Sequence, residues 1–356
     1  MSDLWKTLKA ARRPLLLYGM GNGADKIIAV LDRFGIPWAD TFASDGFVRG
    51  QFFHGKRVLS YSEAKEKYGD FTVLVSFGSS LPDVCSRVEE MEKEVELFAP
   101  DVPVCGEMLY TEEWEETHRK ELDILRASLA DEKSREVLDA VLSYKLTGKL
   151  AFLRSCETAQ NDDLAALFPH DFTAYADLGA YTGDTIREMT ARYPAIRSVI
   201  AMEPSAKSAA KLRAYADTVT RSAITVVEAA AWDREENLSF ADGSARNSTV
   251  SSVNDKEKSG AKLRTVMASP LDAHALFAGE RLLIKYDVEG AEVEALRGST
   301  RTIRENESSL IVSAYHRTDD FLILPPLLSS LCPNHRLYLR KHPGFPAWDV
   351  NFYVTK

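Results

Sequence analysis

Two kinds of hydrophobic pattern alternate along the amino-terminal third of the chain. Short apolar runs at residues 15–18, 38–44 and 72–77 are typical of buried strands, and an amphipathic stretch with helical spacing covers residues 25–34. Strand patterns that alternate with helix patterns predict a parallel sheet with helices packed on it. Only about half of a full doubly wound fold is expected to fit into residues 15–108.

The pattern changes after residue 108. From residue 111 to 167, charged and apolar residues recur at helical spacing, and no apolar run resembles a strand. We therefore expect a helical connector. The predicted organisation is a smaller amino-terminal Rossmann-like domain of the nucleotide-binding type at 1–108, the connector at 109–170 and a second α/β domain at 171–356.

A second series of strand and helix patterns begins near residue 175. Five buried strands are expected in it: 174–178, 198–202, 224–228, 282–286 and 309–314. Two last strands, 336–340 and 350–354, are expected to form an antiparallel hairpin that completes a seven-stranded sheet. Between the third and fourth strands we expect a hairpin-type turn at Asp242 and Gly243, and then a mobile polar loop at 254–260.

Composition narrows the classes of function. The chain has 356 residues and a formal net charge of −9, which argues against a protein that coats nucleic acid, because phosphate binding needs clustered Lys and Arg. The four cysteines lie far apart and form no C-x-x-C pair, so neither a disulfide framework nor a zinc site is expected. No apolar run reaches the ~20 residues that a membrane span requires. We expect a cytoplasmic protein without a nucleic-acid or membrane partner.

A glycine-containing turn follows the first strand of the second series. Asp177 ends that strand, Gly179 permits a tight turn, and Gly183 lets the next helix approach closely, so that backbone N–H groups point into the crevice above the sheet. The next strand delivers Glu203 at its end, where a carboxylate can accept hydrogen bonds from two ribose hydroxyls. This arrangement predicts a nucleotide or nucleoside ligand.

Two more carboxylates, Asp287 and Glu289, come just after another predicted buried strand. Burying a charge costs too much free energy for these groups to be core filler. Ligands of open α/β sheets bind at the carboxyl ends of the strands. We therefore expect Asp177, Glu203 and Asp287 to converge on one crevice.

The residues of this second domain resemble those of FkbM-type, S-adenosylmethionine-dependent methyltransferases of the Rossmann-like class. The resemblance covers about residues 160–356, and its most specific segment is 285–292. Tyr181 departs from it, because many relatives carry a smaller polar residue at that position. The segments that carry the resemblance are 177–185, 203–204, 229–233, 285–292 and 313–316.

The resemblance implies a site for S-adenosyl-L-methionine. The turn after Asp177 would cradle the methionine part, Glu203 would hold the ribose, residues 228–230 would border the adenine, and Asp287 would face the reacting centre. The cofactor-binding residues expected on this basis are Asp177, Gly179, Ala180, Tyr181, Gly183, Asp184, Thr185, Glu203, Pro204, Ser205, Glu228, Ala229, Ala230 and Asp287.

The implied reaction is methyl transfer, most plausibly to the oxygen of a hydroxyl on a sugar or another small metabolite. A hydroxyl becomes a better nucleophile when a base removes its proton. The candidate catalytic residues are His316, Asp287 and Glu289. We favour His316 as the base and Asp287 as a positioning group, with a hydrogen-bonded loop histidine as the second interpretation of His316. Three further histidines show no metal-ligand spacing, so no metal is expected: His54, His118 and His274.

A second glycine cluster lies near the start of the chain. Residues 19–24 match G-x-G-x-x-A after a strand, and Asp45 follows about 20 residues later, as a dinucleotide-binding pattern requires. Three alternatives stay open: an NAD(P)-dependent enzyme, a catalytically inactive protein with a nucleotide ligand in this domain, and a structural or assembly role for the cluster. A homodimer is also left open.

Overall fold

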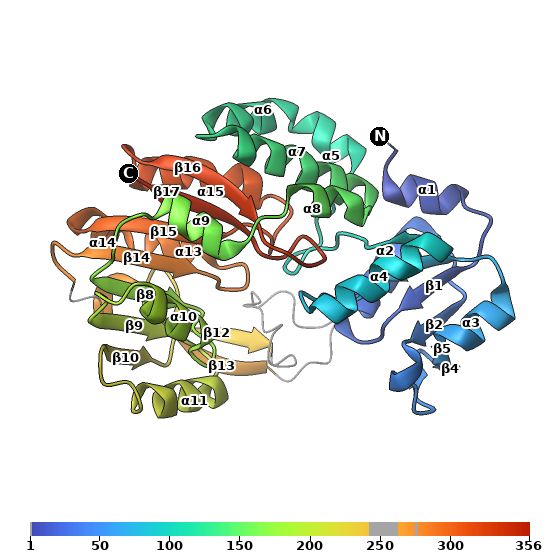
Figure 1. Cartoon of the computed structure of the whole chain (residues 1–356), viewed down its shortest axis with the longest axis horizontal. Helices are drawn as coiled ribbons and strands as arrows, with labels where there is room; N and C mark the ends of the chain where they lie inside the picture. Colours follow the sequence, from blue (N-terminus) through green and yellow to red (C-terminus); the bar gives the residue numbers. More distant parts are fainter. Residues whose placement is uncertain (1, 242–262, 275–276) are drawn as a thin grey trace.

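The computed structural model describes residues 2–241, 263–274 and 277–356. These residues form two α/β parts, one at each end of the molecule, with a group of helices between them (Figure 1). The turn expected at Asp242 and Gly243 and the loop expected at 254–260 lie outside the described residues. Among the described helices, none is both long and apolar enough to cross a bilayer.

The amino-terminal part contains a parallel five-stranded sheet with the order β5-β2-β1-β6-β7. Its strands are β1 (Leu15–Tyr18), β2 (Asp40–Ala43), β5 (Leu59–Ser60), β6 (Thr72–Val75) and β7 (Glu96–Phe98). Around them lie α1 (Leu4–Ala10), α2 (Asn22–Phe34), the 3-10 helix η1 (Asp45–Phe47), the hairpin β3 (Phe52–Phe53) and β4 (Lys56–Arg57), α3 (Tyr61–Tyr68) and α4 (Pro82–Glu94).

This sheet is larger than the half-fold expected from the sequence. It extends to both sides of β1, so it has the doubly wound order with a switch point between β1 and β6. Too few strands were expected from the sequence because β5 has only two residues and β7 only three. Runs of that length are too short for a hydrophobic period to be recognised.

The carboxy-terminal part contains the predicted seven-stranded sheet, with the order β10-β9-β8-β14-β15-β17-β16. Its last three strands pair antiparallel, so the predicted hairpin is confirmed, and β17 lies between β15 and β16. The strands are β8 (Ala174–Leu178), β9 (Ser198–Met202), β10 (Ala223–Val227), β14 (Arg281–Tyr286), β15 (Glu307–Ser313), β16 (Arg336–Lys341) and β17 (Val350–Thr355).

Helices and a small sheet surround these strands. The helices are α10 (Asp184–Arg192), α11 (Ala206–Ala216), α12 (Leu271–His274), α13 (Glu292–Arg297), α14 (Thr300–Glu305) and α15 (Asp320–Leu331). The small sheet consists of β11 (Ala230–Ala231), β12 (Glu236–Ala241) and β13 (Leu263–Ser269). All five residues of β8 are buried, as expected for a central strand covered on both faces.

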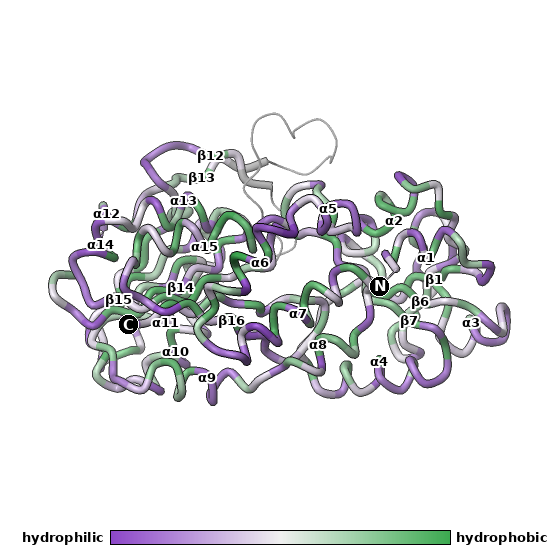
Figure 2. The backbone as a smooth tube through the Cα atoms, turned by 90° about the horizontal axis from the view of Figure 1, so that it is seen from above, coloured by the Kyte–Doolittle hydropathy of each residue, from purple (hydrophilic) through white to green (hydrophobic). Residues whose placement is uncertain are grey.

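Helices occupy the region between the two sheets, as the periodicity predicted. They are α5 (Glu112–Thr117), α6 (Arg119–Ser128), α7 (Glu132–Thr147), α8 (Leu150–Cys156) and α9 (Gln160–Leu167). Seen from above, α7 and α8 lie between the two parts (Figure 2). Leu129 pairs with Leu337 in an isolated bridge, so this helical group is also joined to the final hairpin.

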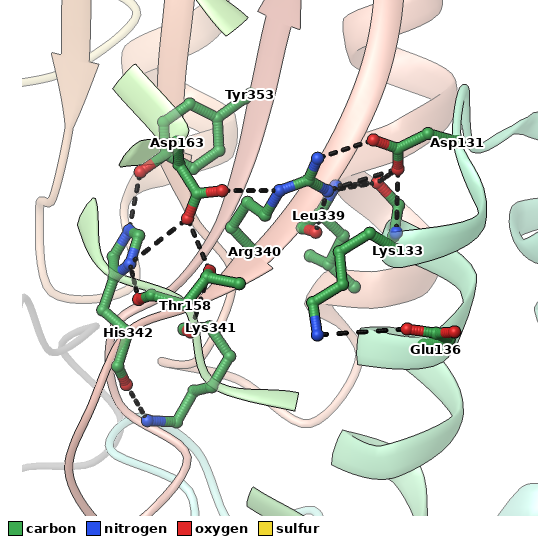
Figure 3. Close-up of polar contacts among 11 residues, drawn as sticks. Asp131, Lys133, Glu136, Thr158, Asp163, Leu339, Arg340, Lys341, His342 and Tyr353 are labelled. Atoms are coloured by element: carbon green, nitrogen blue, oxygen red, sulfur yellow. Dashed lines mark hydrogen bonds and ion pairs between the residues drawn. The ribbon is translucent and has the colours of Figure 1, made fainter. Parts of the chain in front are cut away.

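A buried polar network connects α7 and α9 to β16 (Figure 3). The guanidinium of Arg340 donates to Asp163 on α9 at 2.9 Å and to Asp131, the N-cap residue of α7, at 2.6 Å. Beside it, His342 and the hydroxyl of Tyr353 are 2.7 Å apart. Arg340 is 5% exposed and Asp163 is 6% exposed, so water solvates these two charged groups only weakly.

We expect Asp163→Asn to destabilise the protein by about 3 kcal/mol, because removal of one partner leaves part of a buried charge unpaired. Urea denaturation of the wild type and the variant measures this difference. The matched control is Asp139→Asn, which breaks the half-exposed pair with Arg126 and should cost less than about 1 kcal/mol. Equal losses in the two variants would contradict the importance of the buried network.

Candidate active site

The turn after β8 touches the end of β14. Gly179 has a φ of +88°, and a Cβ at this position would overlap the carbonyl oxygen of Asp287. Gly183 has a φ of +86° and faces Tyr215, whose ring would lie 2.6 Å from an added Cβ. Both positions therefore require glycine, and the first of them brings the predicted cofactor turn into contact with Asp287.

Glu203 connects two of the predicted segments. It follows β9, is 7% exposed, and accepts hydrogen bonds from the backbone N–H of Tyr181 at 2.9 Å and of Ser205 at 2.8 Å. Burial raises the pKa of this carboxyl to about 7, although the two N–H groups act in the opposite direction. The carboxylate thus joins the turn after β8 to the turn after β9.

The other cofactor residues expected from the sequence lie at the carboxyl ends of β8, β9 and β10. Asp184 and Thr185 begin α10, Ser205 is the N-cap residue of α11, and Ala229 and Ala230 are buried after β10. Because these three strands are neighbours in the sheet, their turns share one edge. Ala180 is buried, and Pro204 directly follows Glu203. Glu228 differs in forming an ion pair with Arg213 at 2.8 Å.

A lysine lies between two aspartates of the site. Lys285 Nζ lies 3.1 Å from Asp287 Oδ2 and 3.9 Å from Asp177 Oδ1. Asp177 is fully buried, and neither of its carboxylate oxygens has a hydrogen-bond partner among the described residues. Burial raises the pKa of Asp177 to about 6. Burial also opposes ionisation of Asp287, but Lys285 and then His316 outweigh it and hold the pKa of Asp287 below its usual range.

His316 is fully buried and surrounded by carboxylates. Its Nδ1 lies 2.9 Å from Glu292 Oε1, and its Nε2 lies 3.5 Å from Asp287 Oδ1 and 3.7 Å from Glu289 Oε2. Burial acts to lower the pKa of His316, but Glu292, followed by Asp287 and Glu289, raises it to about 10. At neutral pH the ring is therefore the positively charged imidazolium, with a proton on both nitrogens.

Glu289 and Asp287 are the accessible members of this group, with side chains that are 32% and 29% exposed. Burial raises the pKa of Glu289 to about 7, with His316 acting in the opposite direction. The φ of Glu289, +53°, is unusual for a residue with a side chain, and Tyr181 across the site has a φ of +46°. Such conformations cluster at functional sites.

Three residues of the site were not singled out by the sequence: Lys285, Glu292 and Tyr315. Glu292 is 1% exposed and, besides facing His316, accepts hydrogen bonds from the N–H groups of Val288 and Gly290 at 3.0 and 3.4 Å. The hydroxyl of Tyr315 donates to Asp287 Oδ1 at 2.9 Å. All three belong to segments that carry the family resemblance, but only the folded geometry distinguishes them from their neighbours.

The amino-terminal glycine cluster has packing roles in the structure. A Cβ on Gly23 would overlap the carbonyl oxygen of Ser76, and one on Gly19 would lie 2.7 Å from the ring of Phe77. Asp45 accepts hydrogen bonds from the backbone of Tyr61 at 2.9 Å and from the hydroxyl of Ser62 at 2.8 Å. These contacts explain Gly19, Gly23 and Asp45 by packing, whereas a Cβ on Gly21 would meet nothing within 4 Å. The described residues add no support for a nucleotide ligand here or for a homodimer.

A cavity of about 770 Å³ lies away from this group of residues. Phe168, Asp171 and Arg192 are among the residues that line it, and they precede β8 and β9. It therefore lies toward the amino ends of these strands, opposite the edge that carries the carboxylates. Among the described residues, no group of three or more His, Cys, Asp and Glu side chains is arranged to hold a metal ion.

Comparison with known proteins gives a family match and an extensive structural match. Residues 177–343 match the model of the methyltransferase FkbM domain. The crystal structure of methyltransferase FkbM from Methylobacillus flagellatus KT is 21% identical, and the alignment covers 98% of this chain and 92% of that one with a TM-score of 0.69. The two-part fold is therefore shared by that protein.

Other solved structures match less well. Precorrin-6y C5,15-methyltransferase from Geobacter metallireducens GS-15 is 13% identical over 55% of this chain and 84% of that one, with a TM-score of 0.32. A putative O-methyltransferase from Klebsiella pneumoniae is 13% identical over 68% and 97% of the two chains, with a TM-score of 0.31. No curated protein matches the chain significantly.

We expect Glu292→Gln to lower the pKa of His316 by about 1–3 units, because it removes the nearest opposite charge. Histidine titration by NMR measures this directly. The raised pKa also implies that protonation of His316 stabilises the folded protein fully below about pH 6.5, and that this stabilisation is lost as the pH rises through about 10. Glu294→Gln on the same helix is the matched control. An unchanged titration of His316 in Glu292→Gln would exclude the ion pair.

Proposed function

Since residues 177–343 belong to the FkbM methyltransferase family, we propose that the chain transfers the methyl group of S-adenosyl-L-methionine to a hydroxyl oxygen of a sugar or another small metabolite. The observation that carries this proposal is a group of three carboxylates, two of them buried, at the carboxyl edge of β8, β9 and β14. Its members are Asp177, Glu203 and Asp287, and Gly179 brings the first turn into contact with the third strand.

The residues present fit this cofactor. Asp177 has two buried carboxylate oxygens without hydrogen-bond partners among the described residues, and the glycine turn that follows it brings backbone close to the end of β14. When bound, S-adenosyl-L-methionine supplies an electrophilic methyl group on a positively charged sulfur. The excess of carboxylates over the cations Lys285 and His316 favours a positively charged ligand.

Each segment has a proposed part in binding. The turn at 179–185 would hold the methionine part, and Glu203 would accept hydrogen bonds from the ribose hydroxyls while it keeps the N–H groups of Tyr181 and Ser205 in place. Residues 228–230 would border the adenine. Asp287, fixed by Lys285 and Tyr315, would lie nearest the reacting centre.

The proton of the acceptor hydroxyl needs a base, and three groups are candidates. His316 is fully buried and already protonated at neutral pH, whereas Glu289 is partly exposed and has a pKa of about 7. These properties favour Glu289 for the role in which the sequence favoured His316. In this scheme His316 holds Glu289 and Asp287 in position as a cation, and Asp287 orients the acceptor.

The alternatives from the amino-terminal glycine cluster have weaker support. Gly19 packs against the ring of Phe77, and Asp45 forms hydrogen bonds within the first domain, so two parts of the dinucleotide pattern have roles in the fold itself. We therefore propose neither an NAD(P)-dependent enzyme nor an inactive nucleotide-binding protein.

Glu203→Ala should weaken binding of S-adenosyl-L-methionine and of its demethylated product, because each lost hydrogen bond to the carboxylate is worth ~1.5–3 kcal/mol. Isothermal titration calorimetry measures the affinity. Glu203→Gln, which keeps one acceptor oxygen, should show a smaller loss, and the exposed Glu307→Gln is the control. If Glu203→Ala binds as tightly as the wild type, the ribose assignment is incorrect.

The pH dependence of kcat/KM distinguishes the two candidate bases, because it reports the pKa of the free enzyme. With an acceptor identified by a screen of hydroxylated metabolites, kcat/KM should rise with pH and level off above about 7 if Glu289 is the base. A rise that continues to about pH 10 would identify His316 instead. Glu289→Gln should lower turnover by ~10²–10⁴, with Glu294→Gln as the control.

A further inference from the structure

The segment between β7 and α5 contacts the main chain of the proposed methyl-transfer site. We call residues 101–108 the crossing segment. The backbone N–H of Cys105 donates to the carbonyl of His316 at 2.8 Å, and the thiol of Cys105 donates to the carbonyl of Glu289 at 2.9 Å. Burial raises the pKa of this thiol to about 12, so it keeps the proton that it donates. One cysteine thus contacts the main chain of both candidate bases.

A lysine of the amino-terminal domain holds the crossing segment. Lys26 is on α2, directly after the glycine cluster, and its ammonium donates to the carbonyls of Pro103 at 3.0 Å and Val104 at 2.6 Å. At the other end of the segment, the hydroxyl of Thr318 donates to the carbonyl of Met108 at 2.5 Å. The crossing segment therefore accepts hydrogen bonds from Lys26 on α2 of the first domain and, at Met108, from Thr318 of the second domain.

The backbone of Glu289 needs such support. A residue with a side chain is strained in the left-handed region, and it keeps this conformation only where its surroundings determine it. Around Glu289, Glu292 accepts from the N–H groups on either side, and Arg317 donates to the carbonyl of Gly290 at 2.9 Å. The thiol of Cys105 supplies the contact to Glu289 itself, and an added Cβ on Gly290 would lie 2.6 Å from its sulfur.

We propose that the amino-terminal domain is a positioning element of the methyl-transfer site, and that Lys26 and Cys105 are its positioning residues. Lys26 fixes the crossing segment, and Cys105 fixes the main chain at Glu289 and His316, so that their side chains face the acceptor side of the site. This inference rests on the proposed function. Neither residue contacts the segments proposed to bind the cofactor, so it concerns the reacting groups and not cofactor affinity.

Hydrogen–deuterium exchange of the full chain tests the proposal without an acceptor. Cys105→Ala and Lys26→Met should speed exchange of the amides at 288–291 and 316–317 by about threefold to tenfold, the loss expected for one hydrogen bond. Cys105→Ser, which keeps a donor, should restore slow exchange. The controls Cys85→Ala and Lys93→Met change a cysteine and a lysine elsewhere in the first domain and should leave these amides unchanged.

Calorimetry with S-adenosyl-L-methionine accompanies the exchange measurements. Faster exchange confined to the two amide groups, with normal cofactor affinity and rescue by Cys105→Ser, supports the proposal. Unchanged exchange in Cys105→Ala and Lys26→Met overturns it, and so does faster exchange throughout the chain, because that shows a general loss of stability. Failure of the wild type to bind S-adenosyl-L-methionine contradicts the proposed function instead, whatever the exchange shows.

Discussion

The site depends on one steric constraint, the contact between the turn after β8 and the end of β14. Gly179 lies so close to the carbonyl oxygen of Asp287 that no side chain fits between them. This contact sets the turn after β8 against the end of β14. The charges beside it are arranged by strand register, because Lys285 on β14 is the pairing partner of Asp177 on β8 and Asp287 follows two residues later, so that the lysine contacts both carboxylates.

The site gathers several charged groups. Four carboxylates, those of Asp177, Asp287, Glu289 and Glu292, lie near the cations Lys285 and His316; Asp177, Glu292 and His316 are buried, whereas the side chains of Asp287 and Glu289 are 29% and 32% exposed. Burial opposes ionisation, so the pKa values of Asp177 and Glu289 rise to about 6 and 7, while the two cations keep Asp287 ionised. Such a group is costly for a protein that only needs to fold. A positively charged ligand would offset much of that cost, which agrees with the cofactor proposed here.

The sequence predicted most of the helices and strands that a local hydrophobic pattern can specify. The seven-stranded sheet, its final hairpin and the helical connector were all predicted, because long buried strands and amphipathic helices have clear periods. The glycine turn and the strand-end carboxylates also marked the edge on which the candidate site lies. The short strands β5 and β7 were missed because two or three residues carry no period. Glu292 and Cys105 were missed for another reason: Cys105 is 184 residues from the carbonyl that its thiol contacts, and no local pattern encodes such a partner.

The order of the amino-terminal sheet bears on what that domain does. A doubly wound sheet binds ligands at its switch point, between β1 and β6 in this chain. Beside that place, Gly19 packs against Phe77 and Gly23 against Ser76, and Gly78 faces the ring of Trp348 from the loop of the final hairpin. The backbone of Ser79 also pairs with Phe345 of that loop. A fold suited to a nucleotide thus uses its loops to contact the second domain, which is the arrangement that a positioning role for the first domain requires.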